Sequence, residues 1–187
     1  MTEATVHKTR HFFPAEMFLH SAGHFVRKVI TDDPPQWPDL MAAASLLALS
    51  LEALVNSLGP QLLDDFSDFE SASPVAKLRL INESVGLGFD KSQQPISDIR
   101  ELARLRNKMA HPKYKKLQYS SERLLLREAQ RLLSDESKTL HDLEKAITPE
   151  SVDKWHKAVV SVTRDLVENI EPDLQKGFSK SWLEIHE

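Results

Sequence analysis

Residues 38–60 read PDLMAAASLLALSLEALVNSLGP and are mostly apolar. Pro38 suits the first turn of a helix, and Gly59-Pro60 predicts where that helix ends. Apolar side chains recur on most sides of the predicted helix, and a helix of this kind packs in the middle of a bundle. The apolar positions are Leu40, Ala43, Ala44, Leu47, Leu51, Leu54, Val55 and Leu58.

The same stretch is nearly long enough to cross a membrane, because residues 40–58 form an almost continuous apolar run. The run contains Glu52, however, and a carboxylate at the bilayer centre costs roughly 2.5–3.5 kcal/mol on insertion scales. No Lys or Arg flanks the run closely. We therefore expect a buried core helix and no membrane association.

A polar stripe interrupts this apolar helix, at Ser45, Glu52 and Asn56. Burying a carboxylate without a partner is expensive, so Glu52 needs a cation from a neighbouring element. We expect that cation to be Arg106.

Helical patterns with clear starts and stops surround this stretch and predict an all-α fold. One expected helix begins at Pro14 and ends before Thr31, and another begins at Ser73-Pro74 and ends at Gly86. A further helix begins at Ile96 and ends at His111, and the next includes 124–133 with a weak extension to Ile147. The last expected helix runs from Thr148-Pro149 to Glu171-Pro172. Strand-length alternation is missing from the sequence. The 187 residues therefore predict a single domain, an antiparallel bundle of five to six helices over about 14–170 with a C-terminal tail, 171–187.

Composition narrows the class of protein further. The chain has no cysteine, which excludes a disulfide framework, a thiolate metal site and a cysteine nucleophile. Residues 1–14 are polar and lack the apolar core of a secretory signal. We expect a cytoplasmic protein.

One basic window opposes the overall net charge of −4. Between residues 100 and 116 the only acid is Glu101, whereas the basic residues are Arg100, Arg104, Arg106, Lys108, Lys113, Lys115 and Lys116. A basic patch on an acidic protein indicates a small anionic target. His111 lies in this window directly before Pro112, which disfavours helical geometry at His111 and places the imidazole at the helix exit.

The sequence Arg106-Asn107-Lys108-Met109-Ala110-His111 resembles the Arg-x4-His signature of the HEPN superfamily, with Asn107 at the polar position that often follows the arginine. The resemblance implies a bundle of four to five helices with the motif at one end of a late helix. It also implies a polar residue on an earlier helix facing the motif, which Glu52 and Asn56 match.

The resemblance implies a metal-independent endoribonuclease that needs no cofactor and acts as a homodimer, with two motifs meeting in one cleft. Attack of a ribose 2′-OH on the adjacent phosphate would leave a 2′,3′-cyclic phosphate and a 5′-OH. His111 would act as general base or acid, because histidine is the side chain best suited to accept and release a proton near neutral pH, and Arg106 would stabilise the transition state. Asn107 would orient the phosphate or the histidine. Arg104, Lys108, Lys113 and Lys115 would hold the RNA backbone.

Two functional classes remain open at this point. The first is an RNA-cleaving toxin or antiphage effector, held in check by an antitoxin or regulatory protein. The second is a non-catalytic HEPN-like module that binds a nucleotide or scaffolds a complex. In the second case Arg106 would be a structural ion-pair partner of Glu52, and His111-Pro112 an ordinary helix end.

Two other sets of residues have weaker functional interpretations. Glu16, His20 and His24 have the i, i+4 spacing of a zinc site but lack an evident further ligand, which favours a solvated face. Trp37, Trp155 and Trp182 are expected in the core or at docking surfaces, with base stacking as the alternative.

Overall fold

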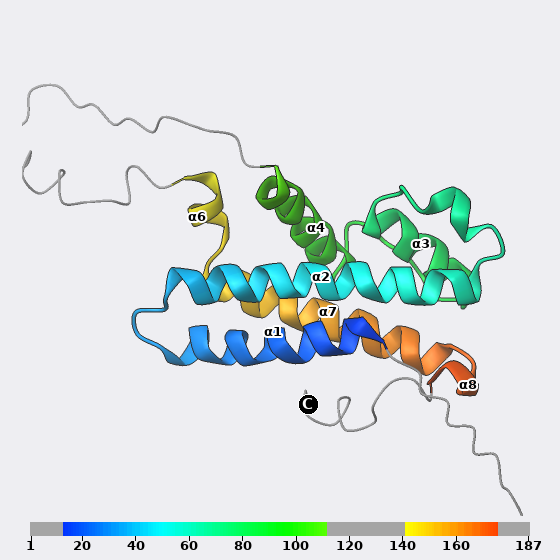
Figure 1. The fold of residues 1–187 in the computed structure, drawn as a ribbon, viewed down its shortest axis with the longest axis horizontal. Helices are drawn as coiled ribbons and strands as arrows, with labels where there is room; N and C mark the ends of the chain where they lie inside the picture. Colours follow the sequence, from blue (N-terminus) through cyan, green and yellow to red (C-terminus); the bar gives the residue numbers. More distant parts are fainter. Residues whose placement is uncertain (1–12, 112–140, 176–187) are drawn as a thin grey trace, which may run out of the picture.

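Helix α2 (Trp37–Leu62) is the central element of the computed structural model, which describes residues 13–111 and 141–175. It contacts α1 (Pro14–Thr31), α3 (Pro74–Ser84), α4 (Ile96–Ala110) and α7 (Pro149–Asn169) (Figure 1). Every apolar position predicted to be buried on α2 is buried. The described part of the chain contains no strand, so the all-α class is confirmed there.

The long helices enclose one hydrophobic core. Helices α1 and α2 run antiparallel and α7 packs along both, while α3 and α4 lie across α2 on the side away from α1 (Figure 1). Leu47, Leu54 and Leu58 of α2 are fully buried in this core. Each such leucine contributes about 1.5–3 kcal/mol relative to an exposed position.

Helix α2 is long and apolar enough to cross a membrane, but length and composition alone are weak evidence for a membrane span. Its apolar window has a mean hydropathy of 1.6, and 50% of the window is buried inside the protein. The core helix of a soluble protein passes the same test. The contacts of α2 with four other helices agree with the prediction of a core helix.

The prediction that Gly59-Pro60 ends α2 was wrong, because the helix continues to Leu62. Pro60 removes only one backbone hydrogen bond in the last turn, and the N–H of Leu63 still bonds to the carbonyl of Gly59 at 2.9 Å. Gly59 serves a packing role instead. A Cβ atom at this position would lie 2.0 Å from Cε2 of Phe66, so only glycine allows the ring to approach this closely.

The segment after α2 returns the chain to the bundle through the 3₁₀-helix η1 (Phe66–Phe69) and then α3. The predicted start of α3 is confirmed, since the hydroxyl of Ser73 accepts a hydrogen bond from the N–H of Ala76 at 3.2 Å. Gly86 follows the helix with φ of 76°, a left-handed conformation that favours glycine.

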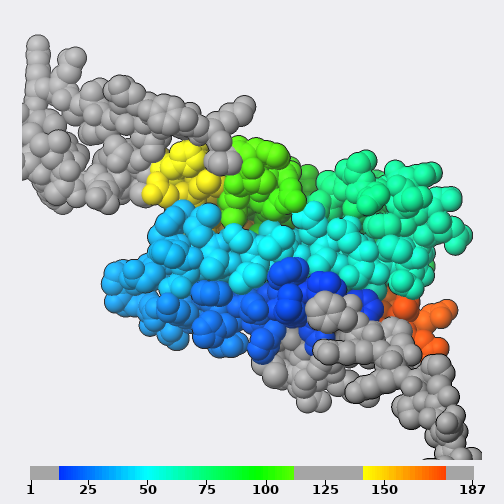
Figure 2. Space-filling model, viewed as in Figure 1, coloured from blue at the N-terminus to red at the C-terminus, as the bar shows by residue number. Residues whose placement is uncertain are grey.

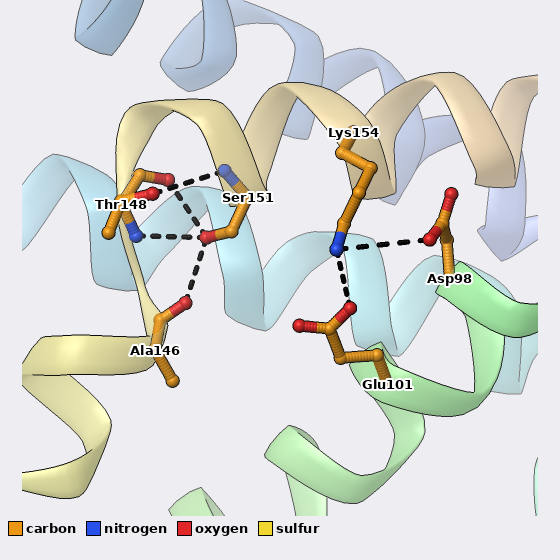
Figure 3. Close-up of polar contacts among 6 residues, drawn as sticks. All are labelled: Asp98, Glu101, Ala146, Thr148, Ser151 and Lys154. Carbon is orange, nitrogen blue, oxygen red and sulfur yellow. Dashed lines mark hydrogen bonds and ion pairs between the residues drawn. The ribbon is translucent and has the colours of Figure 1, made fainter.

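Helices α4 and α7 are joined by ion pairs near the predicted start of α7. The ammonium of Lys154 lies 2.5 Å from a carboxylate oxygen of Glu101 and 3.8 Å from one of Asp98 (Figure 3). One turn earlier, Thr148 and Ser151 cap α7 reciprocally through side-chain and backbone groups (Figure 3). The predicted start at Thr148-Pro149 is therefore confirmed.

Two predicted features differ from the structure or lie outside it. Helix α7 ends at Asn169, and the short α8 (Pro172–Gln175) follows at the proline that was expected to stop it. The helix predicted over 124–133 lies outside the described residues, and α6 (Asp142–Ala146) is the described element in its weak extension. The tail beyond residue 175, with Trp182, also lies outside the described part.

Candidate functional site

Arg106 and Glu52 form the ion pair that the sequence predicts. One guanidinium nitrogen of Arg106, Nη2, donates to Oε2 of Glu52 at 2.9 Å and to Oε1 at 3.2 Å. The pair joins α4 to α2 at a partly exposed position, with 40% of the arginine side chain and 32% of the glutamate side chain accessible. A pair this exposed contributes little to stability. Its clearer effect is to fix the direction of the guanidinium.

Asn107 lies next to this pair. The other terminal nitrogen of Arg106, Nη1, donates to Oδ1 of Asn107 at 3.4 Å. The guanidinium has five N–H donors, and these contacts with Glu52 and Asn107 use at most three of them. At least two donors therefore remain for a further acceptor.

A groove of about 890 Å³ opens beside the pair, between the end of α2, the η1 segment, α3 and α4. Glu52, Asn56, Arg106 and Asn107 line it, so four of the predicted site residues lie together. Figure 2 shows the surfaces of α4 and of the α3–η1 region side by side above α2. The groove is large enough for a drug-sized or nucleotide-sized ligand.

Lys77 is a groove residue that the sequence analysis missed. It is only 5% exposed, its ammonium donates to Oδ1 of Asn56 at 2.8 Å, and it lies 5.3 Å from the ring centroid of Phe66. The burial of Lys77 could have been predicted from its position, because Lys77 and Ile81 are i, i+4 neighbours and Ile81 belongs to the buried face of α3.

The groove is not uniformly basic. Its lining includes the cations Lys77 and Arg106, and the acids Glu52, Asp64 and Glu70. Because Glu52 already pairs with Arg106, Lys77 is the groove cation that lacks a carboxylate within ion-pair distance among the described residues.

His111 lies at the end of α4, as predicted, but outside the groove lining. It is the C-cap residue, with φ of −127° and ψ of 59°, and its backbone N–H bonds to the carbonyl of Asn107 at 3.1 Å. Its side chain is exposed. The structure thus brings Arg106 and Asn107 into the groove wall and leaves His111 on the adjoining surface.

The predicted backbone-binding cations fall into two groups. Arg104 and Lys108 are exposed on α4 and do not line the groove. Lys113 and Lys115 lie outside the described residues.

The alternative zinc interpretation finds no support in the described part of the chain. Among residues 13–111 and 141–175, no group of three or more His, Asp or Glu side chains is placed to hold a metal ion. His20 and His24 are exposed on α1, in agreement with a solvated face. Of the tryptophans, Trp155 is buried in the core and Trp37 is partly exposed.

A second, smaller cavity of about 350 Å³ lies between the loop after α3 and helix α7. Asp165 is part of its wall, and burial raises the pKa of this carboxyl above its ordinary value of 3.8, with a further increase from Glu168. None of the predicted site residues lies there.

Comparison with known proteins adds no relative of this chain. No family model, no curated protein and no solved structure matches it. The residues of the groove and of the end of α4 are therefore the basis for inferring a function.

Proposed function

We propose that the chain is a metal-independent endoribonuclease of the HEPN type, with Arg106, Asn107 and His111 as its catalytic residues. The supporting observation is the oriented guanidinium of Arg106, which Glu52 holds in the groove wall with donors to spare. Asn107 joins the two ends of the motif, because its side chain contacts Arg106 and its carbonyl bonds to the N–H of His111.

The reaction would proceed by attack of a ribose 2′-OH on the neighbouring phosphorus. His111 takes the proton from the 2′-OH, the new O–P bond forms, and the bond from phosphorus to the 5′ oxygen breaks. The departing oxygen takes up a proton to become a 5′-OH, and the 2′,3′-cyclic phosphate remains. The guanidinium of Arg106 stabilises the negative charge that accumulates on the phosphorane.

This proposal includes a homodimer. One Arg106–His111 motif supplies one imidazole, whereas the reaction uses both a base and an acid. A two-fold axis would bring a second imidazole to the same phosphate. A strict monomer at micromolar concentration in sedimentation would argue against this part of the proposal.

The second candidate is a non-catalytic HEPN-like module that binds a nucleotide or a protein partner. Two observations favour it. Glu52 already accepts hydrogen bonds from the Arg106 guanidinium, and His111 does not line the groove. In this case the chain would still use the groove but would break no bond.

Cleavage of RNA by purified protein in the presence of EDTA separates the two candidates. The wild type should cut single-stranded RNA, leave a 2′,3′-cyclic phosphate and arrest growth when expressed, whereas His111→Ala should do none of these. His24→Ala is the matched control, since His24 is an exposed histidine on α1, away from the motif. If wild type and His111→Ala are equally inert, the catalytic proposal is wrong and the binding module is favoured.

A further inference from the structure

Lys77 is a buried cation without a carboxylate within ion-pair distance among the described residues, although the acids Asp64 and Glu70 also line its groove. Its ammonium has three donors, and its contacts among the described residues are the neutral amide of Asn56 and the face of Phe66. Moving an ammonium out of water costs several kcal/mol, which a carboxylate partner usually offsets. Arg106, which also lines the groove, has such a partner in Glu52, but Lys77 has none within ion-pair distance in the part of the chain that the structure describes.

The position of Lys77 in the groove lining places it where a ligand can supply this partner. Lys77 and Asn56 both line the 890 Å³ groove, so an anion entering the groove can reach the wall that they form. Two of the three ammonium donors remain after the bond to Asn56. Asn56 holds the ammonium in place, and Phe66 covers one side of it.

We propose that Lys77 is a binding residue for a phosphate group, and that this phosphate belongs to an RNA strand lying in the groove. Lysine binds phosphate as a point charge, without the planar match that arginine offers to a carboxylate. The groove extends from Lys77 to Arg106, so a polymer with a phosphate at every step can occupy both cations. The identification of the strand as RNA rests on the proposed function, whereas anion binding by Lys77 does not.

The decisive variant is Asn56→Asp. It places a carboxylate at the position of an amide oxygen that lies 2.8 Å from the Lys77 ammonium, and so supplies an internal anion that competes with the phosphate. The change is nearly isosteric, and the new ion pair should maintain or raise the melting temperature. Gln61→Glu is the matched control, because it adds the same charge to an exposed position of α2 outside the groove lining.

Lys77→Met gives a second, independent test. It keeps the long side chain that packs under Phe66 and removes the charge. Because a buried ammonium is removed, the melting temperature should hold or rise. A purely structural lysine would instead leave RNA binding unchanged.

Binding is measured on the full chain with a short, fluorescent, 2′-O-methylated single-stranded RNA, which lacks the attacking hydroxyl and cannot be cut. Asn56→Asp and Lys77→Met should weaken binding about tenfold or more, as expected for one lost charge-assisted hydrogen bond. Both should lower the slope of log affinity against log salt by about 0.7, the value for one phosphate of a single strand. Gln61→Glu should change the affinity by less than about threefold, since an exposed charge is screened.

The outcomes separate this inference from the proposed function. Lys77-dependent binding without cleavage of ordinary RNA would support the phosphate site and overturn the ribonuclease. Normal cleavage and unchanged binding in both variants would overturn the phosphate site alone. Binding of inorganic phosphate that Asn56→Asp abolishes, without any binding of RNA, would overturn the RNA assignment and leave the anion site. If neither probe binds, the whole inference is wrong.

Discussion

The guanidinium of Arg106 donates from one nitrogen to both carboxylate oxygens of Glu52, at 2.9 and 3.2 Å, across the contact between α4 and α2. Glu52 is a carboxylate in the middle of a mostly apolar helix, and Arg106 is the first residue of the Arg-x4-His motif. The same contact therefore satisfies a polar group near the core and orients the cation of the candidate site.

This arrangement predicts a different effect of Glu52→Gln on stability and on activity. The pair is partly exposed, so the free energy of unfolding should fall by about 1 kcal/mol or less in urea titration. RNA cleavage should fall by more than about tenfold, because the guanidinium loses its orientation. Glu83→Gln is the control, since Glu83 forms an exposed ion pair with Arg79 at 3.5 Å on α3. Equal cleavage by the two variants would show that orientation by Glu52 does not matter.

Close packing of Gly59 against Phe66 predicts that Gly59→Ala is destabilising, although the same change stabilises most helices by up to about 1 kcal/mol. The new methyl would meet the ring at 2.0 Å, and overpacking of this kind costs about 1–3 kcal/mol. Chemical denaturation measures the effect, and Gly88→Ala is the control because nothing lies within 4 Å of a Cβ there.

A double-mutant cycle tests the cause of that effect. Phe66→Leu removes part of the ring that the methyl meets, so the cost of Gly59→Ala should be smaller in the Phe66→Leu background. If the two changes are simply additive, the contact between Gly59 and Phe66 is not what limits residue 59.

We predict that Asp165→Asn makes the protein more stable, by an amount that depends on pH. The folded state raises the pKa of this carboxyl above 3.8, mainly through burial. Its contribution to stability is therefore fully present below 3.8 and is lost as the pH rises through the raised value. As the pH rises through that range, the melting temperature of Asp165→Asn should increase relative to that of the wild type. At higher pH the difference between the two melting temperatures should stay constant.

The neighbouring charge offers a check on this explanation. Glu168 raises the pKa of Asp165 further, so Glu168→Gln should lower the upper end of the pH range in which the gain develops. A difference between Asp165→Asn and wild type that does not change with pH would contradict the linkage.

The helices could be predicted from the sequence where local chemistry decides them. Pro14, Ser73-Pro74 and Thr148-Pro149 mark starts that the structure confirms, because the first turn of a helix tolerates proline and, at Ser73 and Thr148, a side-chain oxygen caps it. The end of α2 could not be predicted in this way. Gly59 is explained by the ring of Phe66, a contact that forms only when the chain has folded back.

The candidate site was predictable to a similar extent. Charge compensation predicts a cationic partner for Glu52, and the proposed partner, Arg106, is the one that the structure shows. Lys77 was missed because a lysine on a short helix is usually exposed, and its burial depends on the η1 segment and Phe66 covering it. The end of α4 at His111 was predictable from Pro112, whereas the position of His111 relative to the groove depends on how α4 packs against its neighbours.

Arg106→Lys should separate charge from geometry at the motif itself. Lysine keeps a positive charge but cannot bond to Glu52, Asn107 and a phosphate at once, because it lacks the planar arrangement of five donors. On the proposed function, cleavage should fall by about 100-fold or more, the scale of losing one preorganised donor to the transition state. The free energy of unfolding should change by about 1 kcal/mol or less, since a partly exposed pair is replaced by another. Arg27→Lys is the matched control, because Arg27 is exposed on α1 and does not line the groove. If Arg106→Lys cuts RNA as fast as Arg27→Lys, positive charge alone is sufficient at residue 106 and the guanidinium has no specific catalytic role.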